Sequence, residues 1–429
     1  MNILIKNIKA LLFQDDKFVI KDTDILIKDN VISQISDNII CEQVDKEISG
    51  KNKLAMPGLI NTHTHSYMTL FRNAADDLPF SKWLFKNILP LEDKMTAEDA
   101  YWGSMLGIME MINTGTTCFT DMYMFIDKTA RAVEETGIRA FLSRGLVDAA
   151  DEAGGRRRLE EANKEMKNWN GKCDRIQFLY APHAPYTCSP EYLEKIAEQA
   201  ADKNIGITIH LSESRNEVEE IYSKYKMTST QLIEKSGIFN CNTIAAHCVY
   251  IDERDMAILK KNNVSISTNP VSNLKLANGI APLKEIIENG INVCMGTDGA
   301  ASNNTLNMFK EMQILSLIHK GYEEDAEILS ANEVLKCATI NGAKALGISG
   351  SVGVLKEGMK ADICIIDIDK PQYYPRNNLV SSLVYSTCGE EVATVIVDGK
   401  ILMENKEFLT IDTEEVKYNI GQINKRLRI

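Results

Sequence analysis

Residues 57–65 read PGLINTHTH, a short apolar run followed by two histidines that stand two positions apart. Side chains alternate along a β-strand, so His63 and His65 would point to the same side and could bind one ion together. A His-x-His pair alone is a weak signal. Its weight depends on which residues follow the other apolar segments of the chain.

Short apolar segments alternate with longer amphipathic stretches, such as 97–113, 190–203 and 252–261, through the middle of the chain. This alternation is typical of repeated βα units that build a parallel sheet. Candidate strands begin near Leu54, Thr116, Ala140, Ile176, Ile207, Thr243, Val264 and Val293. Eight such units in about 300 residues predict an α/β fold with a closed (β/α)8 barrel of the TIM type.

The two ends of the chain have a different pattern. Strand-like segments with turn signals occur there at 3–5, 24–27, 363–366 and 394–397, the last before the turn pair Asp398-Gly399. We therefore expect residues 1–56 and 361–429 to meet in a small β-sandwich domain with a C-terminal extension. Residues 57–360 would form the barrel.

Polar side chains follow the apolar residues of successive predicted strands. They are His63, His65, Asp121, Arg144, His183, His210, His247, Asn269 and Asp298. In a βα barrel, this carboxyl end of the strands is the active-site face. Five of the six histidines stand at such ends, and only His319 falls in a helical stretch. The pattern predicts one site built by several strands.

Four of these residues form a metal-binding set. His210 follows the apolar run 207–209, and Asp298 stands in the segment MGTDG after the last strand. Three neutral imidazoles and one carboxylate suit zinc with an open position for water, although iron or manganese would accept the same donors. We predict one zinc ion per chain, held by His63, His65, His210 and Asp298. Zinc lowers the pKa of bound water to about 7 and so provides hydroxide at neutral pH.

Two further residues are placed to handle protons. Glu213 stands three residues after His210 and could carry a proton to a substrate, and His247 follows the sixth strand and could orient or deprotonate the water. Each has a plainer alternative, with Glu213 as a solvated loop residue and His247 as a structural residue. For Glu213 the spacing favours catalysis, because it directs the carboxylate toward the metal ligands.

Composition excludes several classes of protein. The 429 residues carry 48 basic and 60 acidic side chains, a formal charge of -12, which argues against a nucleic-acid partner. No apolar run approaches the roughly 18 residues that a membrane span needs. The ten cysteines form no Cys-x-x-Cys pair, so we expect reduced thiols and a cytoplasmic location. A homo-oligomer is compatible with this composition, which leaves the oligomeric state open.

These residues lie in blocks that resemble the amidohydrolase superfamily over nearly the whole chain. Within it, the sequence is most similar to the 5′-methylthioadenosine/S-adenosylhomocysteine deaminase family. The matching blocks are PGLINTHTHSYM (57–68), LPFSKWLFKNILPLE (78–92), SRGLVD (143–148), APHAPY (181–186), TIHLSE (208–213), AAHC (245–248), NPVSNLKL (269–276) and GTDGAASNN (296–304). Binuclear relatives bridge two metals with a lysine after strand four. Residues 176–184 contain no lysine, which supports a single zinc.

The resemblance implies a zinc-dependent hydrolytic deaminase. Its substrate would be a small adenine nucleoside, such as 5′-methylthioadenosine or S-adenosylhomocysteine, and its products ammonia and the hypoxanthine nucleoside. Hydroxide would attack C6 while Glu213 delivers a proton to ring N1, and His247 with Asp298 would stabilise the attacking oxygen.

The resemblance also implies the residues that hold the substrate. Glu92 would bind the ribose hydroxyls, His183 the purine, and Trp83 would form an apolar wall. Arg144 and Arg156 would bind a substrate carboxylate. On pattern alone, Trp83 could equally be a core residue, Glu92 a helix-end charge and the arginines solvated surface.

Other functions share most of these residues. A guanine deaminase, an adenosine or 5′-deoxyadenosine deaminase, or a chlorohydrolase would use nearly the same zinc face, and only the substrate loops would separate them. A non-enzymatic relative that uses the barrel as a binding scaffold belongs to another class. Such a protein would not need an intact set of metal and proton-handling residues.

Overall fold

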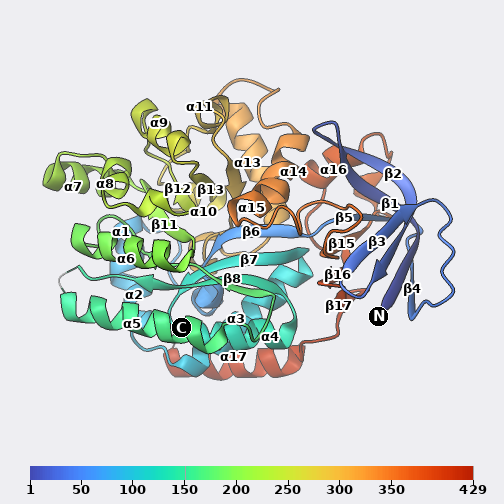
Figure 1. Ribbon diagram of the computed structural model, residues 1–429, viewed down its shortest axis with the longest axis horizontal. Coiled ribbons are helices and arrows are strands. Elements are labelled where there is room, and N and C mark those ends of the chain that lie inside the picture. The colour runs from blue at the N-terminus through green and yellow to red at the C-terminus, as the bar shows by residue number, and fades with distance from the viewer. Residues whose placement is uncertain (150, 429) are drawn as a thin grey trace.

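A computed structural model describes residues 1–149 and 151–428. In it, parallel strands follow one another in chain order and form the barrel (Figure 1). Its strands are β6 (Leu59–Thr64), β7 (Thr116–Tyr123), β8 (Arg139–Leu146), β9 (Ile176–Phe178) continued by β10 (Ala181–Pro182), β11 (Ile207–Leu211), β12 (Thr243–His247), β13 (Ser265–Thr268) and β14 (Val293–Met295). They pair as two arcs, β6 to β10 and β11 to β14. Backbone hydrogen bonds from Thr208 N to Tyr180 O (2.9 Å) and from Asp298 N to His63 O (3.0 Å) join the arcs. The predicted barrel is confirmed.

Helices alternate with these strands. They are α3 (Ala97–Asn113), α4 (Ile126–Thr136), α5 (Glu152–Trp169), α6 (Pro190–Lys203), α7 (Arg215–Tyr225), α8 (Ser229–Lys235), α9 (Glu253–Lys261), α10 (Pro270–Lys275), α11 (Leu283–Glu288), α12 (Ala300–Asn303), α13 (Met308–Tyr322), α14 (Ala331–Ala338) and α15 (Ile340–Ala345). Side chains of Thr96, Ser189 and Asp252 cap α3, α6 and α9 by accepting backbone N–H groups. These caps explain why α3 and α6 coincide with the predicted stretches and why α9 begins one residue later than expected.

The strand expected near Leu54 is not part of the barrel. Leu54 lies in β5 (Lys53–Pro57), which pairs with β1 and β15. The first barrel strand, β6, begins at Leu59, one residue after the end of β5. Gly58 separates the two strands, and a Cβ atom at this position would lie 2.0 Å from Thr117 Oγ1. Only glycine permits this close approach, so one residue diverts an otherwise continuous apolar run from one sheet to the other.

The two ends of the chain build one nine-stranded sheet beside the barrel (Figure 1). It contains β5 together with β1 (Asn2–Gln14), β2 (Lys17–Lys28), β3 (Val31–Ser36), β4 (Lys46–Ser49), β15 (Ile363–Asp367), β16 (Val392–Val397), β17 (Lys400–Glu404) and β18 (Glu407–Phe408). A Cβ atom at Gly399, in the turn after β16, would lie 1.9 Å from Asp29 O, in the turn after β2. The sheet therefore curls over a core that includes the buried Ile5, Ile27 and Ile363. This arrangement agrees with the predicted sandwich.

The C-terminal helix α17 (Thr413–Leu427) packs along α3 of the barrel (Figure 1). Ile423 and Leu427 join an apolar cluster on the barrel side, and Arg426 pairs with Asp99 at the start of α3. The shorter α16 (Leu379–Tyr385) packs against α14.

The domain boundaries at 57 and 361 stay a prediction. No helix in residues 1–149 and 151–428 is long and apolar enough to cross a membrane.

A buried ion pair links the barrel to the terminal sheet. Arg139, the first residue of β8, donates from Nε and Nη2 to the two carboxylate oxygens of Asp362, at 2.8 and 3.0 Å. Asp362 stands just before β15 and also accepts the backbone N–H of Asp398 at 2.8 Å. Both side chains of the pair are largely shielded from water.

We expect Arg139→Met to lower the free energy of unfolding by about 3 kcal/mol, because it leaves a buried carboxylate without its counter-charge. The urea midpoint of the full chain measures the loss. Lys417→Met removes an exposed ion pair with Glu414 and serves as the control, with an expected change within about 0.5 kcal/mol. Equal midpoints for the two variants would show that the Arg139 pair does not hold the two sheets together.

Candidate active site

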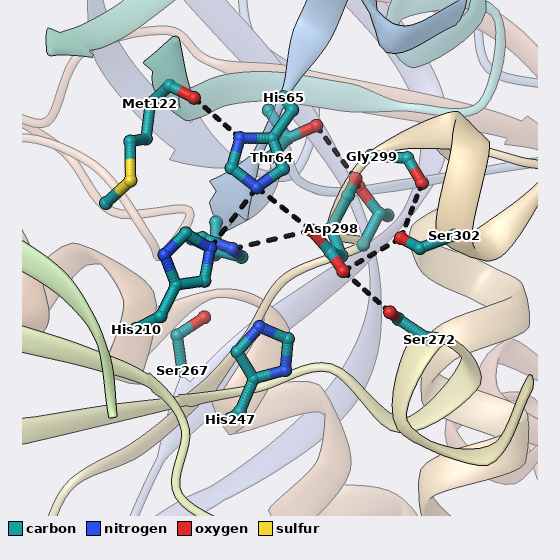
Figure 2. A network of polar contacts seen from close by, with 12 residues as sticks. Thr64, His65, Met122, His210, His247, Ser267, Ser272, Asp298, Gly299 and Ser302 are labelled. Carbon is teal, nitrogen blue, oxygen red and sulfur yellow. Dashed lines mark hydrogen bonds and ion pairs between the residues drawn. The ribbon is translucent and has the colours of Figure 1, made fainter. Parts of the chain in front are cut away.

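The predicted metal-binding residues meet at the carboxyl end of the barrel. His63 lies in β6 and His65 directly after it, His210 lies in β11, His247 ends β12, and Asp298 follows β14. Figure 2 shows the rings of His65, His210 and His247 grouped around the carboxylate of Asp298. All five side chains are buried. The barrel therefore brings together residues that lie far apart in the sequence.

The spacing of the donor atoms fits a tetrahedral metal site. His65 Nε2 lies 3.2 Å from Asp298 Oδ1 and 3.3 Å from His210 Nε2, and His63 Nε2 lies 3.5 Å from Asp298 Oδ1. Zinc bonds of about 2.0–2.1 Å at tetrahedral angles place the ligand atoms about 3.3 Å apart. These three distances are close to the spacing that one tetrahedral ion would impose on its ligands.

Hydrogen bonds fix the orientation of two of the rings. The Nδ1 atoms of His65 and His210 lie 2.5 and 2.8 Å from the backbone oxygens of Met122 and His183. A carbonyl can only accept, so each Nδ1 carries the proton and each Nε2 of a neutral ring presents a lone pair to the centre. Neither nitrogen of His63 has a hydrogen-bond partner among the described residues. Nitrogen lone pairs that face one another beside a carboxylate form a site suited to a cation.

The environment favours the metal-binding form of three of the four predicted ligands, whereas contacts with Asp298 outweigh burial at His65 and raise its pKa to about 9. Burial lowers the pKa of His63 to about 4, and burial together with the neighbouring histidines holds the pKa of His210 well below its usual range. Burial opposes ionisation of Asp298, but its contacts with His63 and His65 outweigh that effect and hold its pKa well below the usual range. Neutral imidazoles and an ionised carboxylate are what a metal binds.

Asp298 is held in place by two serines. Its Oδ2 accepts from Ser272 Oγ at 2.6 Å and from Ser302 Oγ at 2.8 Å, which leaves Oδ1 directed toward the histidines (Figure 2). Asp298 and His247 have φ angles of 59° and 71°. Such left-handed backbone is uncommon outside glycine and often occurs at functional sites.

His247 and Glu213 lie next to this centre. Nδ1 of His247 contacts Asn273 Oδ1 at 2.8 Å, and its Nε2 lies 3.9 Å from Glu213 Oε2. One nitrogen or oxygen from each of His63, His210, His247 and Asp298 lies within 4.8 Å of the others. His247 is therefore close enough to act as a fifth donor. Which of these residues bind the metal and which handle protons stays a prediction.

Glu213 is buried, which excludes the solvated-loop alternative. Its Oε1 accepts a hydrogen bond from Asn278 Nδ2 at 3.0 Å. Burial raises the pKa of the Glu213 carboxyl. A carboxyl group with a raised pKa can hold and deliver a proton near neutral pH.

A second buried carboxylate supports the loop that carries Glu213, and the sequence analysis missed it. Glu217, in the first turn of α7, accepts the backbone N–H groups of Ser212 (2.8 Å) and Glu213 (3.0 Å). It also accepts from Ser229 Oγ at 2.9 Å. Ser214 and Glu217 stand three residues apart, a capping-box spacing that indicates a helix start but not the bonds of Glu217 to Ser212 and Glu213.

A cavity of about 400 Å³ opens above this centre. Its walls are largely apolar, and its volume is within the range of small-molecule sites. Of the predicted substrate residues, the walls include Trp83, Glu92, Arg144, His183 and Glu213. The structure therefore joins one end of a ligand-sized cavity to the candidate metal centre.

Three of these side chains have features suited to ligand binding. Trp83 begins a π-helical turn (Trp83–Ile88), and its buried Nε1 has no hydrogen-bond partner among the described residues. Glu92, at the end of α2 (Leu89–Glu92), accepts from Tyr123 Oη, and burial raises its pKa. His183 contacts Thr187 Oγ1 at 3.0 Å, and burial lowers its pKa to about 4, so the ring is neutral.

The predicted pair of arginines is not brought together. Arg144 lies in β8 and faces the cavity, but Arg156 lies on the exposed side of α5, pairs with Glu152, and is absent from the cavity wall. Arg156 lies on a helix because Asp151 accepts the Gly154 N–H and starts α5 at Glu152. On this helix, Arg158 is the arginine that reaches the cavity.

The comparisons with known proteins agree with this site. Residues 54–402 match the Amidohydrolase family. The chain is 47% identical to the 5-methylthioadenosine/S-adenosylhomocysteine deaminase of Thermoanaerobacter pseudethanolicus, covering 100% of this chain and 99% of that protein. It is 45% identical to the 5'-deoxyadenosine deaminase of Methanosarcina acetivorans, with coverages of 97% and 96%.

A solved structure has the same fold as this chain. An adenosine deaminase from Xanthomonas campestris with bound zinc superposes with a TM-score of 0.93 at 29% identity, covering 99% of this chain and 98% of that one. The family match spans most of the sequence, and the sequence relatives cover nearly all of it. The chain therefore belongs to the amidohydrolase family, together with the proteins named 5-methylthioadenosine/S-adenosylhomocysteine deaminases.

Proposed function

We propose that this protein is a zinc-dependent deaminase that replaces the 6-amino group of an adenine nucleoside by oxygen and releases ammonia. The observation that carries the proposal is the buried cluster of His63, His65, His210 and Asp298 at the end of a ligand-sized cavity. The names of the relatives, which cite 5-methylthioadenosine, S-adenosylhomocysteine and 5'-deoxyadenosine, support the substrate class.

The donor set suits zinc, although iron or manganese would also accept it. His63, His65, His210 and Asp298 would hold the ion, which would supply a hydroxide nucleophile at neutral pH. The stoichiometry that we propose is one ion per chain, because residues 176–184 contain no lysine that could bridge a second.

The chain's own groups move the protons. Glu213 is buried beside His247 and is placed to give a proton to ring N1, which makes C6 more open to attack. His247 has Nδ1 engaged by Asn273, so its Nε2 is the atom that can hold a proton from the attacking water. Asp298 Oδ1, oriented by Ser272 and Ser302, helps to hold the attacking oxygen.

The cavity wall would position the nucleoside. Glu92 can accept hydrogen bonds from the two ribose hydroxyls, and the neutral ring of His183 can bond the purine. Trp83 offers an apolar surface for the base or sugar. A cytoplasmic location is part of the proposal and is inferred from composition alone.

Ammonia release from a panel of substrates tests the function as a whole. We expect turnover of 5′-methylthioadenosine, 5′-deoxyadenosine, adenosine or S-adenosylhomocysteine, and none of guanine. A kcat/KM for guanine above that for every nucleoside would favour the guanine-deaminase alternative instead.

Removal of the metal should abolish activity. The purified protein is expected to contain about one zinc per chain by mass spectrometry, and dialysis against a chelator should stop ammonia release until zinc is restored, because no other group provides hydroxide at neutral pH. Full turnover by protein shown to be free of metal would contradict this mechanism.

Glu213→Gln should lower kcat by about 10²-fold or more, because the amide keeps the shape of the side chain but cannot transfer the proton. Zinc content should stay the same, and KM should change by less than about 3-fold. Glu219→Gln, at an exposed position of α7, is the matched control. A near-normal kcat would make Glu213 a bystander.

Glu217→Gln tests the support of the Glu213 loop. The amide has one acceptor oxygen, so its NH₂ group would face a backbone N–H of Ser212 or Glu213. We expect kcat to fall about 10-fold with zinc content and KM unchanged, because a small misplacement of a proton donor costs rate rather than binding. Parallel losses of zinc and protein stability would instead indicate a general structural role.

A further inference from the structure

The two serines that hold Asp298 (Figure 2) stand on short helices. Ser272 lies in α10, which has six residues, and Ser302 lies in α12, which has four. Helices of this length are not stable by themselves and need contacts with the rest of the fold. The orientation of the Asp298 carboxylate therefore depends on the contacts that fix α10 and α12.

Glu311 connects both short helices to a longer one. It lies in the first turn of α13, which has 15 residues, and its side chain is fully buried. Its Oε2 accepts the backbone N–H of Val271 at 3.2 Å, and its Oε1 accepts from Asn303 Nδ2. Val271 stands directly before Ser272, and Asn303 stands directly after the other serine. One carboxylate thus fixes a residue next to each of the two serines.

The side chain of Asn303 continues this network toward the barrel. Its Nδ2 also donates to the backbone oxygen of Thr297, the residue before Asp298, at 2.7 Å. The N–H of Thr297 donates in turn to Asn61 Oδ1, in β6, at 3.0 Å. The backbone before Asp298 is therefore also held by the sheet. The contribution of Glu311 falls mainly on the serines and on the carboxylate that they orient.

We propose that Glu311 is a positioning residue for the zinc site, because by holding α10 and α12 it keeps the Asp298 carboxylate directed toward the metal. This inference rests on the zinc site of the proposed function. Glu311 is not among the described residues of the cavity wall, so it acts through its partners rather than on the substrate. Groups that orient a metal ligand typically contribute about 10-fold to 100-fold in metal affinity.

Zinc affinity tests this role without an activity assay. Burial raises the pKa of Glu311 to about 8, so the variant must remove both acceptor oxygens and not the charge alone. Glu311→Met does so and keeps a side chain of similar length. We expect its zinc dissociation constant, measured by competition with a chelator of known affinity, to rise about 10-fold. Glu311→Gln keeps one acceptor oxygen and should show a smaller rise, of about 3-fold.

Glu391 provides a matched control. It is also a buried carboxylate that accepts one backbone N–H, from Cys388, and one side-chain amide, from Gln372, but it stands directly before β16 of the terminal sheet. Glu391→Met should lower the urea midpoint and leave the zinc dissociation constant within about 2-fold. Equal losses of zinc affinity in the two Met variants would show a general loss of stability and would overturn the proposal. If Glu311→Met fails to fold, the Gln variants at the two positions decide the same comparison.

A combined variant tests the path from Glu311 to Asp298. Ser272→Ala together with Ser302→Ala removes the bonds that orient the carboxylate and should itself weaken zinc binding. Adding Glu311→Met should then change the dissociation constant by less than about 2-fold, because the contacts through which Glu311 acts are already absent. A further 10-fold loss would mean that Glu311 acts by another route, which would overturn the proposal. Failure of the proposed function is a distinct result, since the wild-type protein would then bind no zinc or release no ammonia from any nucleoside.

Discussion

One backbone hydrogen bond, from Asp298 N to His63 O at 3.0 Å, closes the barrel and joins the two ends of the candidate metal centre. It requires the segment after β14 to lie directly against β6. A Cβ atom at Gly296 would lie 2.6 Å from both the backbone nitrogen and oxygen of His63, so glycine is needed at this contact. The fold and the proposed chemistry therefore depend on the same close approach of two strands.

The groups around this contact are oriented in two different ways. His65 and His210, as proposed ligands, donate to backbone carbonyls, which are fixed by the strands themselves. Glu213 and His247, which would move protons, contact the side-chain amides of Asn278 and Asn273. Metal binding needs rigid donors, whereas proton transfer needs a group that can change its protonation state without losing its position. The backbone carbonyl partners meet the first requirement, and the side-chain amide partners meet the second.

The alternation of strands and helices and the polar residues at strand ends could be predicted because both follow from local periodicity. The direction in which a side chain points around a helix could not be predicted. Arg156 and Arg158 lie two residues apart in α5, about 200° around the helix axis, and one pairs with Glu152 while the other reaches the cavity. Glu217 was missed for a similar reason, since its partners are backbone groups that no sequence pattern displays.

The proposed chemistry and the proposed binding of the nucleoside use different parts of this barrel. The proposed metal ligands stand on or directly after strands, where hydrogen bonds of the sheet fix their positions. Of the proposed substrate residues, Trp83 and Glu92 lie outside the barrel strands, in the π-helical turn and in α2. Members of one family can therefore keep the same centre and differ in substrate. The relatives named for 5-methylthioadenosine/S-adenosylhomocysteine and for 5'-deoxyadenosine, at similar identity to this chain, fit that division.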